Sequence, residues 1–396
     1  MAFLHSFWFY CVIFVSFCLL VILFWLRQWK QNLSHKKRPL KDGSFKYIKY
    51  REEDIPKCGQ FTWDDCSSHW KKRMVAVGKK LQKNKVDHIY FVHGTFVGDD
   101  PFDLLRFLEA KLPNIYEKIG MSVLKSYRKN KDTLIGDLGN FSDEYVKLSE
   151  RALNHNIKTY RFTWSSGNHH LARLIASIDL IKKLSYDNKG GQTGTLLIGH
   201  SHAGQVFALL SQIVKNKKLA NGLFLQAIKS GIEDTLSDLL SYRNSIKNLP
   251  IDFVTLGSPH RYCWDLSPRQ RLLHIINHRG KVEDINPYKG IFTTQGGDYI
   301  QLWGIEGSDG ISPLKDHVQI NKDLQDLLGA GFNLSQWSEN VGQGRRVAEQ
   351  GNTLLVDYGD NGKTLNLLKT GLGHIVYTRY KTMLFNLEKI ADQFYS

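Results

Sequence analysis

An apolar run that leads directly into a turn of small residues, at positions 195–205, is the feature that most constrains the fold. This stretch reads "TLLIGHSHAGQ" and is followed by apolar residues at helical spacing. A strand that turns sharply into a helix needs small residues beside the turn, a need that Gly199, Ala203 and Gly204 meet. Such a turn holds its central residue in a strained conformation with the side chain exposed. The pattern therefore favours Ser201 as a nucleophile over a serine in an ordinary polar loop.

The chain beyond residue 44 alternates short apolar runs with segments of helical spacing. Most of the runs are continuously apolar, which is typical of strands buried on both faces. The predicted strands are residues 88–94, 157–164, 195–201, 251–258, 298–305 and 352–359. Between them, apolar residues recur at helical spacing, for example in 171–181 and 206–213. The predicted fold class is α/β, with a mostly parallel sheet that helices cover on both faces.

The start of the chain contains an uncharged apolar run, residues 7–26, which is long enough at about 20 residues to cross a bilayer as a helix. Neither a basic start nor an Ala-x-Ala cleavage site accompanies it, which disfavours a cleaved signal peptide. We expect residues 1–26 to form a single transmembrane anchor and the polar, basic residues 27–43 to form a juxtamembrane linker. Basic residues follow the run and none precedes it, namely Arg27, Lys30, Lys36, Lys37 and Arg38. This bias predicts that the globular part lies on the cytoplasmic side.

Residues 44–396 are expected to form one domain of the predicted fold with two insertions, near 113–142 and 315–350. Both insertions are polar with scattered glycines. Segments of this kind are lids or binding loops where they border a site, and otherwise form tolerated surface. The first contains a basic stretch at 124–132, which we interpret as a solvated loop.

The charge of the chain indicates an anionic partner. Lys and Arg number 53 against 38 Asp and Glu, which gives a formal charge of +15 at pH 7. Such an excess favours lipid headgroups or nucleic acid. No zinc-finger spacing, arginine-rich tract or aromatic RNA-binding signature accompanies it. We therefore expect a membrane partner, through the anchor and the basic surface, and no nucleic acid.

The cysteines agree with a reducing compartment. Cys11 and Cys18 lie in the predicted anchor, and Cys263 stands alone in the domain. Cys58 and Cys66 could form a disulfide in an oxidising compartment, but we interpret them as two reduced thiols in a loop.

The motif around Ser201 resembles the nucleophile turn of the α/β-hydrolase superfamily, in particular that of its membrane-associated lipases and esterases. The usual pattern carries glycine where Ala203 stands, and alanine is the least disturbing replacement. By the order of its motifs, the resemblance covers the chain from about His88 to the C-terminus. It implies an α/β-hydrolase fold and a triad in which the serine comes first, the acid next and the histidine last.

A second motif matches upstream, where "YFVHGTF" places His93 and Gly94 at the end of an earlier predicted strand. In the resembled lipases, the loop after this His-Gly pair supplies one N–H group to the oxyanion hole, and the residue after the nucleophile supplies another. The resemblance therefore implies donors at Thr95 or Phe96 and at His202.

The resemblance places the catalytic base on a loop after the final strand, where His374 follows Gly373 and precedes the closing helix. His200 and His202 flank the serine, but such a turn directs their side chains elsewhere, so we give these two side chains structural roles. Other histidines are interpreted as core or surface residues, among them His274, His278 and His317.

The triad acid is expected on the turn after the penultimate strand, where it would fix the tautomer of the histidine. Asp309 follows the predicted strand 298–305 in "GSDGISP" and is the preferred acid. Asp265 is the alternative one strand earlier. Asp357 and Asp360 are more distant alternatives.

The stretch "FTWSSGNHHLAR" follows the predicted strand 157–164, at the sheet edge where ligands bind in such folds. We interpret Trp164, Ser165 and Asn168 as pocket-wall or helix-capping residues. No paired metal-ligand motif, phosphate loop or dinucleotide fingerprint is present in the sequence, so neither a metal nor a cofactor is expected.

The order Ser201, Asp309, His374 is the order that the resemblance implies, and each residue follows a predicted strand. The sequence thus predicts a membrane-anchored serine hydrolase that cleaves a carboxylic ester through an acyl-enzyme. The predicted anchor suggests a lipid or another acyl ester as the substrate. The alternatives are a thioesterase or an acyltransferase on the same triad, and a catalytically inactive hydrolase fold that serves as a membrane-tethered binding module.

Overall fold

The computed structural model describes most of the domain that follows residue 43. The described residues are 44–50, 62–94, 136–154, 156–188, 193–279, 294–304, 309–310, 312, 314–331, 334–342, 346–359 and 371–395. The predicted anchor and linker, residues 1–43, and most of the insertion at 113–142 lie outside them. Within these ranges, no helix combines the length and apolar character needed to cross a bilayer.

The centre of the domain is a sheet of seven parallel strands, in the order β1-β7-β6-β5-β4-β2-β3. The strands are β1 (Phe45–Lys49), β2 (Val86–Val92), β3 (Lys158–Phe162), β4 (Gly194–His200), β5 (Ile251–Leu256), β6 (Gln270–Asn277) and β7 (Asn352–Asp357). The central strands β4 and β5 are buried over nearly their whole length. The α/β class and the parallel sheet predicted from the sequence are therefore confirmed.

Most of the predicted strands are present. The runs at 88–94, 157–164, 195–201, 251–258 and 352–359 correspond to β2, β3, β4, β5 and β7. Two strands were not predicted. The edge strand β1 has no buried apolar run, and β6 ends in polar residues although Leu272, Leu273, Ile275 and Ile276 fill its interior.

The predicted strand at 298–305 is wrong. Residues Tyr299–Trp303 form the short helix α11, and Asp298 caps its start by accepting a hydrogen bond from the Gln301 main-chain N–H at 2.9 Å. An N-terminal cap of this kind stabilises the first turn of a helix. Asp298 therefore lies directly before a helix, and it is part of the site described below.

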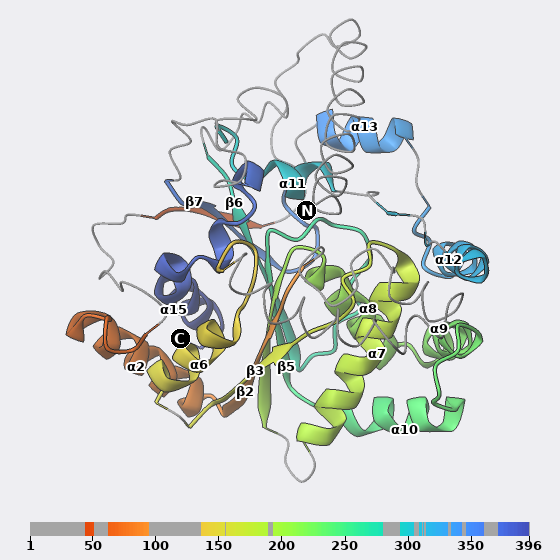
Figure 1. The fold of residues 1–396 in the computed structure, drawn as a ribbon, viewed down its shortest axis with the longest axis horizontal. Helices are drawn as coiled ribbons and strands as arrows, with labels where there is room; N and C mark the ends of the chain where they lie inside the picture. The colour runs from red at the N-terminus through yellow and green to blue at the C-terminus, as the bar shows by residue number, and fades with distance from the viewer. Residues whose placement is uncertain are drawn as a thin grey trace, which may run out of the picture. The chain divides into compact units, whose positions relative to one another are not determined.

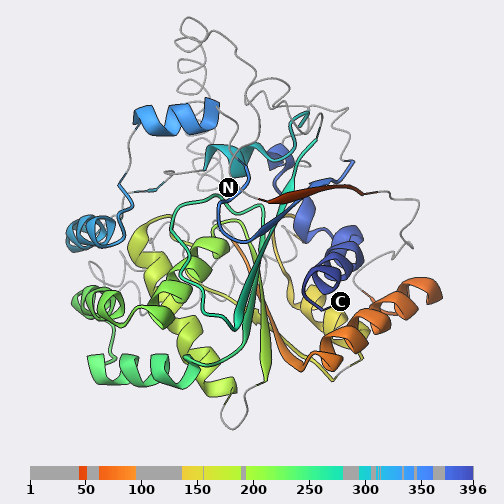
Figure 2. The same cartoon turned by 180° about the vertical axis from the view of Figure 1, so that it is seen from behind.

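Helices cover both faces of the sheet (Figures 1 and 2). One face carries α2 (Ser68–Lys83), α6 (Asp143–Ala152) and α15 (Met383–Phe394). The other side of the sheet carries α7 (His170–Asp187), α8 (Ala203–Lys215), α9 (Lys217–Lys229), α10 (Leu236–Ile246) and α12 (Lys315–Leu327). Helix α13 (Leu334–Gly342) completes the described α-helices.

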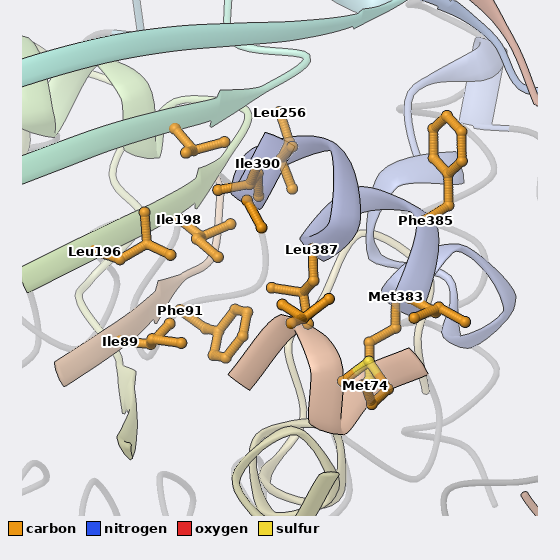
Figure 3. Packing of buried hydrophobic residues seen from close by; sticks show 14 of the residues in the cluster. Met74, Ile89, Phe91, Leu196, Ile198, Leu256, Met383, Phe385, Leu387 and Ile390 are labelled. Carbon is orange, nitrogen blue, oxygen red and sulfur yellow. The ribbon is translucent and has the colours of Figure 1, made fainter. Parts of the chain in front are cut away.

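Each face of the sheet builds its own apolar core. Figure 3 shows the first, in which Ile89 and Phe91 of β2 pack with Met74 of α2 and Leu387 of α15. The second joins the opposite side chains of the same strands to α7 and α8. Successive residues of a strand point to opposite faces, so one continuous apolar run supplies both cores.

The predicted insertion at 315–350 contains two helices, α12 and α13. Helix α12 places Ile320 and Leu324 in the second apolar core, where it packs against α7 and α9. Residues 343–345 lie outside the described part.

Cys66 is disulfide-bonded, so the expectation of a reduced thiol at this position is wrong. Cys58, the other cysteine of that expectation, lies outside the described residues. Cys263 is a free thiol on the surface.

Candidate active site

Ser201 lies at the sharp turn between β4 and α8. Its φ angle is +56°, in the left-handed region that residues with a side chain rarely adopt. Its main-chain N–H donates to the carbonyl oxygen of Leu256 at 2.9 Å, and its own carbonyl accepts from the Gly204 N–H at 3.1 Å. These bonds hold the strained residue between β5 and the first turn of α8. The local geometry is the strand–turn–helix arrangement that the sequence predicts.

The small residues around the turn are required by close contacts. A Cβ atom on Gly199 would lie 2.6 Å from the Phe207 ring and 2.9 Å from the Ala203 Cβ. A Cβ atom on Gly204 would lie 2.4 Å from the Ser258 hydroxyl oxygen. Any larger residue would push α8 away from β4 and β5. The closeness of the helix to the strands is therefore what forces Ser201 into its strained turn.

Gly94, after the end of β2, lies against the serine. A Cβ atom at this glycine would lie 2.5 Å from the Ser201 Cβ and 3.2 Å from the Ser201 hydroxyl oxygen. The residues that follow Gly94 in the chain therefore begin beside Ser201, the position that the resemblance implies for an oxyanion donor. The first of them, Thr95 and Phe96, lie outside the described residues, so their assignment stays a prediction.

His93 forms hydrogen bonds that hold the end of β2 in place. Its Nε2 accepts a hydrogen bond from the Trp164 main-chain N–H at 3.3 Å, and its carbonyl accepts one from the Trp164 indole at 2.9 Å. The Ser166 hydroxyl, on a residue with φ of +65°, donates to the Gly94 carbonyl at 2.7 Å. These bonds join the end of β2 to the segment that follows β3.

His374 follows the short 3-10 helix η4 (Gly371–Gly373), in the connection between β7 and the closing helix, where the sequence places it. Its Nδ1 forms a hydrogen bond with the Asp298 Oδ2 at 2.8 Å. A close approach of two glycines brings the pair together, since a Cβ on Gly373 would lie 2.1 Å from the Gly297 carbonyl oxygen. Both glycines have positive φ angles, +83° at Gly373 and +91° at Gly297.

Asp309, the acid preferred on sequence, does not occupy this position. Its Oδ1 accepts a hydrogen bond from Arg173 at 2.6 Å, and its Oδ2 is bound by Arg261. The two guanidinium groups hold the pKa of Asp309 well below its usual range, although burial alone would raise it. The prediction that Asp309 orients the histidine is therefore wrong, because the expected strand is a helix and Asp298 precedes it.

Among the described alternatives, neither Asp265 nor Asp357 binds His374. The main-chain N–H of Asp265 donates to the Ser211 hydroxyl at 3.1 Å, next to α8. Asp357, at the end of β7, forms an ion pair with Arg279 at 3.5 Å. Asp360 lies outside the described residues.

Asp298 is fully buried and binds hydrogen-bond donors through both oxygens. Oδ2 accepts from His374 and from the Tyr377 hydroxyl, each at 2.8 Å, and Oδ1 accepts from the Gln301 N–H. Burial by itself would raise the pKa of Asp298, but the interaction with His374 outweighs it and lowers the pKa, assisted by the Gln301 bond and the charge of Arg346. The carboxylate is therefore ionised and fixed in direction.

The other ring nitrogen of His374 is available. Its Nε2 is buried and has no hydrogen-bond partner within the described part of the chain. The ring lies beside that of His200, with 4.6 Å between centroids, and His200 immediately precedes the nucleophile. Ser201 follows β4, and His374 reaches the same carboxyl edge of the sheet through its contact with His200, which is the edge where ligands bind in α/β folds.

The His200 side chain has a structural role, whereas that role for the His202 side chain stays a prediction. The His200 Nε2 donates to the His374 carbonyl at 2.9 Å, and burial followed by the neighbouring His374 lowers the pKa of His200 to about 3. Burial, followed by the charge of Arg173, lowers the pKa of His202 well below its usual range. Both imidazoles are neutral at pH 7. The main-chain N–H of His202 follows Ser201 directly and opens α8, where the helix dipole favours negative charge.

The remaining histidines named from the sequence are core residues. His274, His278 and His317 are all buried. The His274 Nδ1 bonds with the Thr255 hydroxyl at 2.6 Å, and the His317 Nδ1 bonds with Ser312 at 3.4 Å.

Ser165 and Asn168 are not helix caps. The residue that caps α7 is His169, whose Nδ1 accepts from the Ala172 N–H at 3.2 Å. The Asn168 side chain instead accepts from Arg173 at 2.5 Å, and the Ser165 hydroxyl accepts from the Gly167 N–H at 3.4 Å.

The residues that sequence reasoning missed are Asp298, Tyr377 and Arg346. The one local signal for the acid is "GGD" at residues 296–298, a flexible turn that ends in a capping residue. The described residues hold no group of three or more His, Cys, Asp or Glu side chains that could bind a metal ion.

Comparison with known proteins gives no match, since no protein-family model, no curated protein and no solved structure matches this chain.

Proposed function

We propose that the chain is a serine hydrolase of α/β-hydrolase fold, which cleaves a carboxylic ester through Ser201, His374 and Asp298. The observation that carries the proposal is the buried Asp298–His374 hydrogen bond at 2.8 Å, whose histidine contacts His200, the residue before a serine held at a φ of +56°. The three residues follow β4, β6 and β7 in the order Ser, Asp, His. This is the chain order of the triad in the resembled hydrolases.

The proposed reaction has two halves, formation of an acyl-enzyme and its hydrolysis, and the same three side chains act in both. The Ser201 oxygen attacks the ester carbonyl while His374 Nε2 takes its proton, and the imidazolium then gives that proton to the leaving alcohol. A water molecule next attacks the acyl-enzyme, gives a proton to His374, and releases the acid as the proton returns to Ser201. Asp298 fixes the tautomer of His374 and stabilises its cation throughout.

The negative oxygen of each tetrahedral intermediate would be stabilised by the His202 main-chain N–H and by an N–H of the loop after Gly94, at Thr95 or Phe96. Gly94 supports this assignment, because its contact with Ser201 starts that loop beside the nucleophile. The proposal needs neither a metal nor a cofactor.

The proposed substrate is a lipid or another acyl ester. It rests on the apolar run at residues 7–26 and the excess of basic residues, which would hold the domain at an anionic bilayer surface. A profile of soluble esters, thioesters and acyl-acceptor alcohols would assign the enzyme as an esterase, a thioesterase or an acyltransferase.

Labelling of the full-length protein in detergent with a fluorophosphonate tests the triad. We expect the wild type to label, Ser201→Ala to lose labelling, and Asp298→Asn to label more slowly by about 10³-fold or more, because the histidine loses its tautomer and counter-charge. Asp265→Asn, at the acid that the sequence offered as an alternative, is the matched control and should label as the wild type does. A folded wild type that fails to label would reject the hydrolase and favour the inactive binding module.

A further inference from the structure

The buried Tyr377 side chain contacts the proposed triad although it is not one of the three triad residues. The Tyr377 hydroxyl, in the 3-10 helix η5 (Val376–Thr378), donates to the Asp298 Oδ2 at 2.8 Å, the same oxygen that binds His374. The hydroxyl oxygen in turn accepts the Asn277 main-chain N–H at 2.7 Å. Because that N–H approaches the lone pairs, it directs the phenolic hydrogen toward the carboxylate.

We propose that Tyr377 is a positioning residue for the catalytic acid, and that its hydroxyl sets the strength with which Asp298 binds the His374 imidazolium. The inference rests on the proposed function. Two donors share one carboxylate oxygen, so each withdraws electron density that the other would otherwise use. Tyr377 therefore weakens the hydrogen bond between Asp298 and His374.

The packing around Tyr377 leaves its ring one position. The ring lies edge-on to His374, at 6.2 Å between centroids, and edge-on to Tyr358 at 5.6 Å. A Cβ atom on Gly257 would lie 2.4 Å from the Tyr377 ring and 2.7 Å from the Asp298 Oδ2, so β5 also presses on the pair. The phenol is completely buried, and burial followed by the Asp298 charge raises the pKa of Tyr377 well above its usual value. It thus keeps the proton that it donates.

Other charged and titratable groups surround the pair from several elements. Arg346, before β7, is buried, and its Nη1 donates to the Asn277 carbonyl at 2.9 Å while its charge lowers the pKa of Asp298. His200, His202 and Tyr358 also approach the pair, and Tyr299 follows Asp298 in the chain. Apart from Tyr358 in its own control variant, these groups are unchanged in the variants below, so a shift in the Tyr377 variants reports on the Tyr377 hydroxyl.

The test is the pH dependence of ester hydrolysis by the full-length protein in detergent, with p-nitrophenyl butyrate as the probe. In Tyr377→Phe we expect the acidic limb of kcat/KM to move up by about one pH unit, since loss of one hydrogen bond to the carboxylate strengthens its hold on the imidazolium. The plateau should fall as well. Tyr358→Phe is the matched control. It removes a neighbouring buried hydroxyl that bonds to Asn386 at 2.7 Å, and it should leave the limb in place.

If Tyr377→Phe does not fold, a second variant provides the test. 3,5-Difluorotyrosine at position 377 retains the hydroxyl but makes it a stronger donor, so the acidic limb should move to lower pH. Opposite shifts in the two variants support the proposal. A limb that stays in place in both, or moves equally in Tyr358→Phe, overturns it and leaves Tyr377 a packing residue.

The same variants separate this inference from the proposed function. Ring titration of His374 by NMR in ¹³C-histidine-labelled protein needs no turnover. If the His374 resonance shifts its midpoint with Tyr377 while the wild type hydrolyses no ester, the positioning role stands and the hydrolase does not. If esters are hydrolysed but the midpoint does not shift, the positioning role is rejected alone.

Discussion

Gly94 shows how closely a single residue can be constrained by the site. Its missing side chain leaves room for Ser201, because a Cβ atom would lie 2.5 Å from the serine Cβ and 3.0 Å from the His200 carbonyl oxygen. Neither neighbour can give way, since one is the strained turn and the other is main chain. The resemblance predicts a glycine at this position from the motif alone. The contact with Ser201 gives the physical reason, because there is no room for a Cβ atom.

Gly94→Ala is therefore expected to displace the nucleophile. We expect fluorophosphonate labelling to fall at least tenfold and the free energy of unfolding to fall by about 1–3 kcal/mol, the usual effect of a side chain forced into a packed site. Gly342→Ala is the control, because a Cβ atom there meets nothing within 4 Å. The measurements are the labelling rates and the urea unfolding curves of both variants. Normal labelling of Gly94→Ala would contradict the expected displacement of Ser201.

The proposed triad acid, Asp298, is a residue of the site that could not be predicted from the sequence. Ser201 follows from a local pattern, an apolar run before a small-residue turn, and His374 follows from the position after the final strand that the resemblance implies. Asp298 does not, because it meets His374 only where Gly297 and Gly373 touch across a long sequence separation. Asp309 has the better turn sequence but binds two arginines instead.

At the scale of elements, Asp309 joins three segments that approach the site. Arg173 comes from α7 and Arg261 from the connection after β5, and their side chains are 0% and 2% exposed. Arg173 also donates to the Tyr262 hydroxyl at 3.1 Å. The aspartate thus neutralises part of a buried positive charge and ties α7 to the β5–β6 connection.

We expect Asp309→Asn to lower the free energy of unfolding by about 3 kcal/mol or more, because two buried guanidinium groups lose the carboxylate that they share. Fluorophosphonate labelling of the folded variant should persist, in contrast with Asp298→Asn. Asp316→Asn, on the exposed first turn of α12, is the control, with a change of about 0.5 kcal/mol or less. Loss of labelling without loss of stability would return Asp309 to the triad.

The elements themselves were predictable where burial and periodicity coincide. Continuous apolar runs identified β2, β4 and β5, which have cores on both faces. The run at 298–305 has a similar composition but forms α11, since the capping bond of Asp298 starts a helical turn. Edge strand β1 escaped detection because most of its side chains are exposed and leave no apolar signal.

At the scale of the whole molecule, two observations make opposite predictions about the side of the membrane on which the domain lies. The basic residues that follow position 26 favour the cytoplasmic side. The disulfide at Cys66 favours an oxidising compartment. We propose the cytoplasmic side for a single-pass membrane protein, because the charges next to an apolar segment act during insertion, before the domain can form a disulfide.

The exposed thiol of Cys263 makes this topology measurable in cells that express the full chain. We expect a membrane-impermeant maleimide to leave Cys263 unmodified in intact cells and to modify it once the membrane is permeabilised. Cys263→Ser corrects for labelling at the other cysteines, and the difference between the two proteins is the signal. Equal modification before and after permeabilisation would place the domain on the oxidising side, where the Cys66 disulfide is stable, and would overturn the orientation that the charges predict.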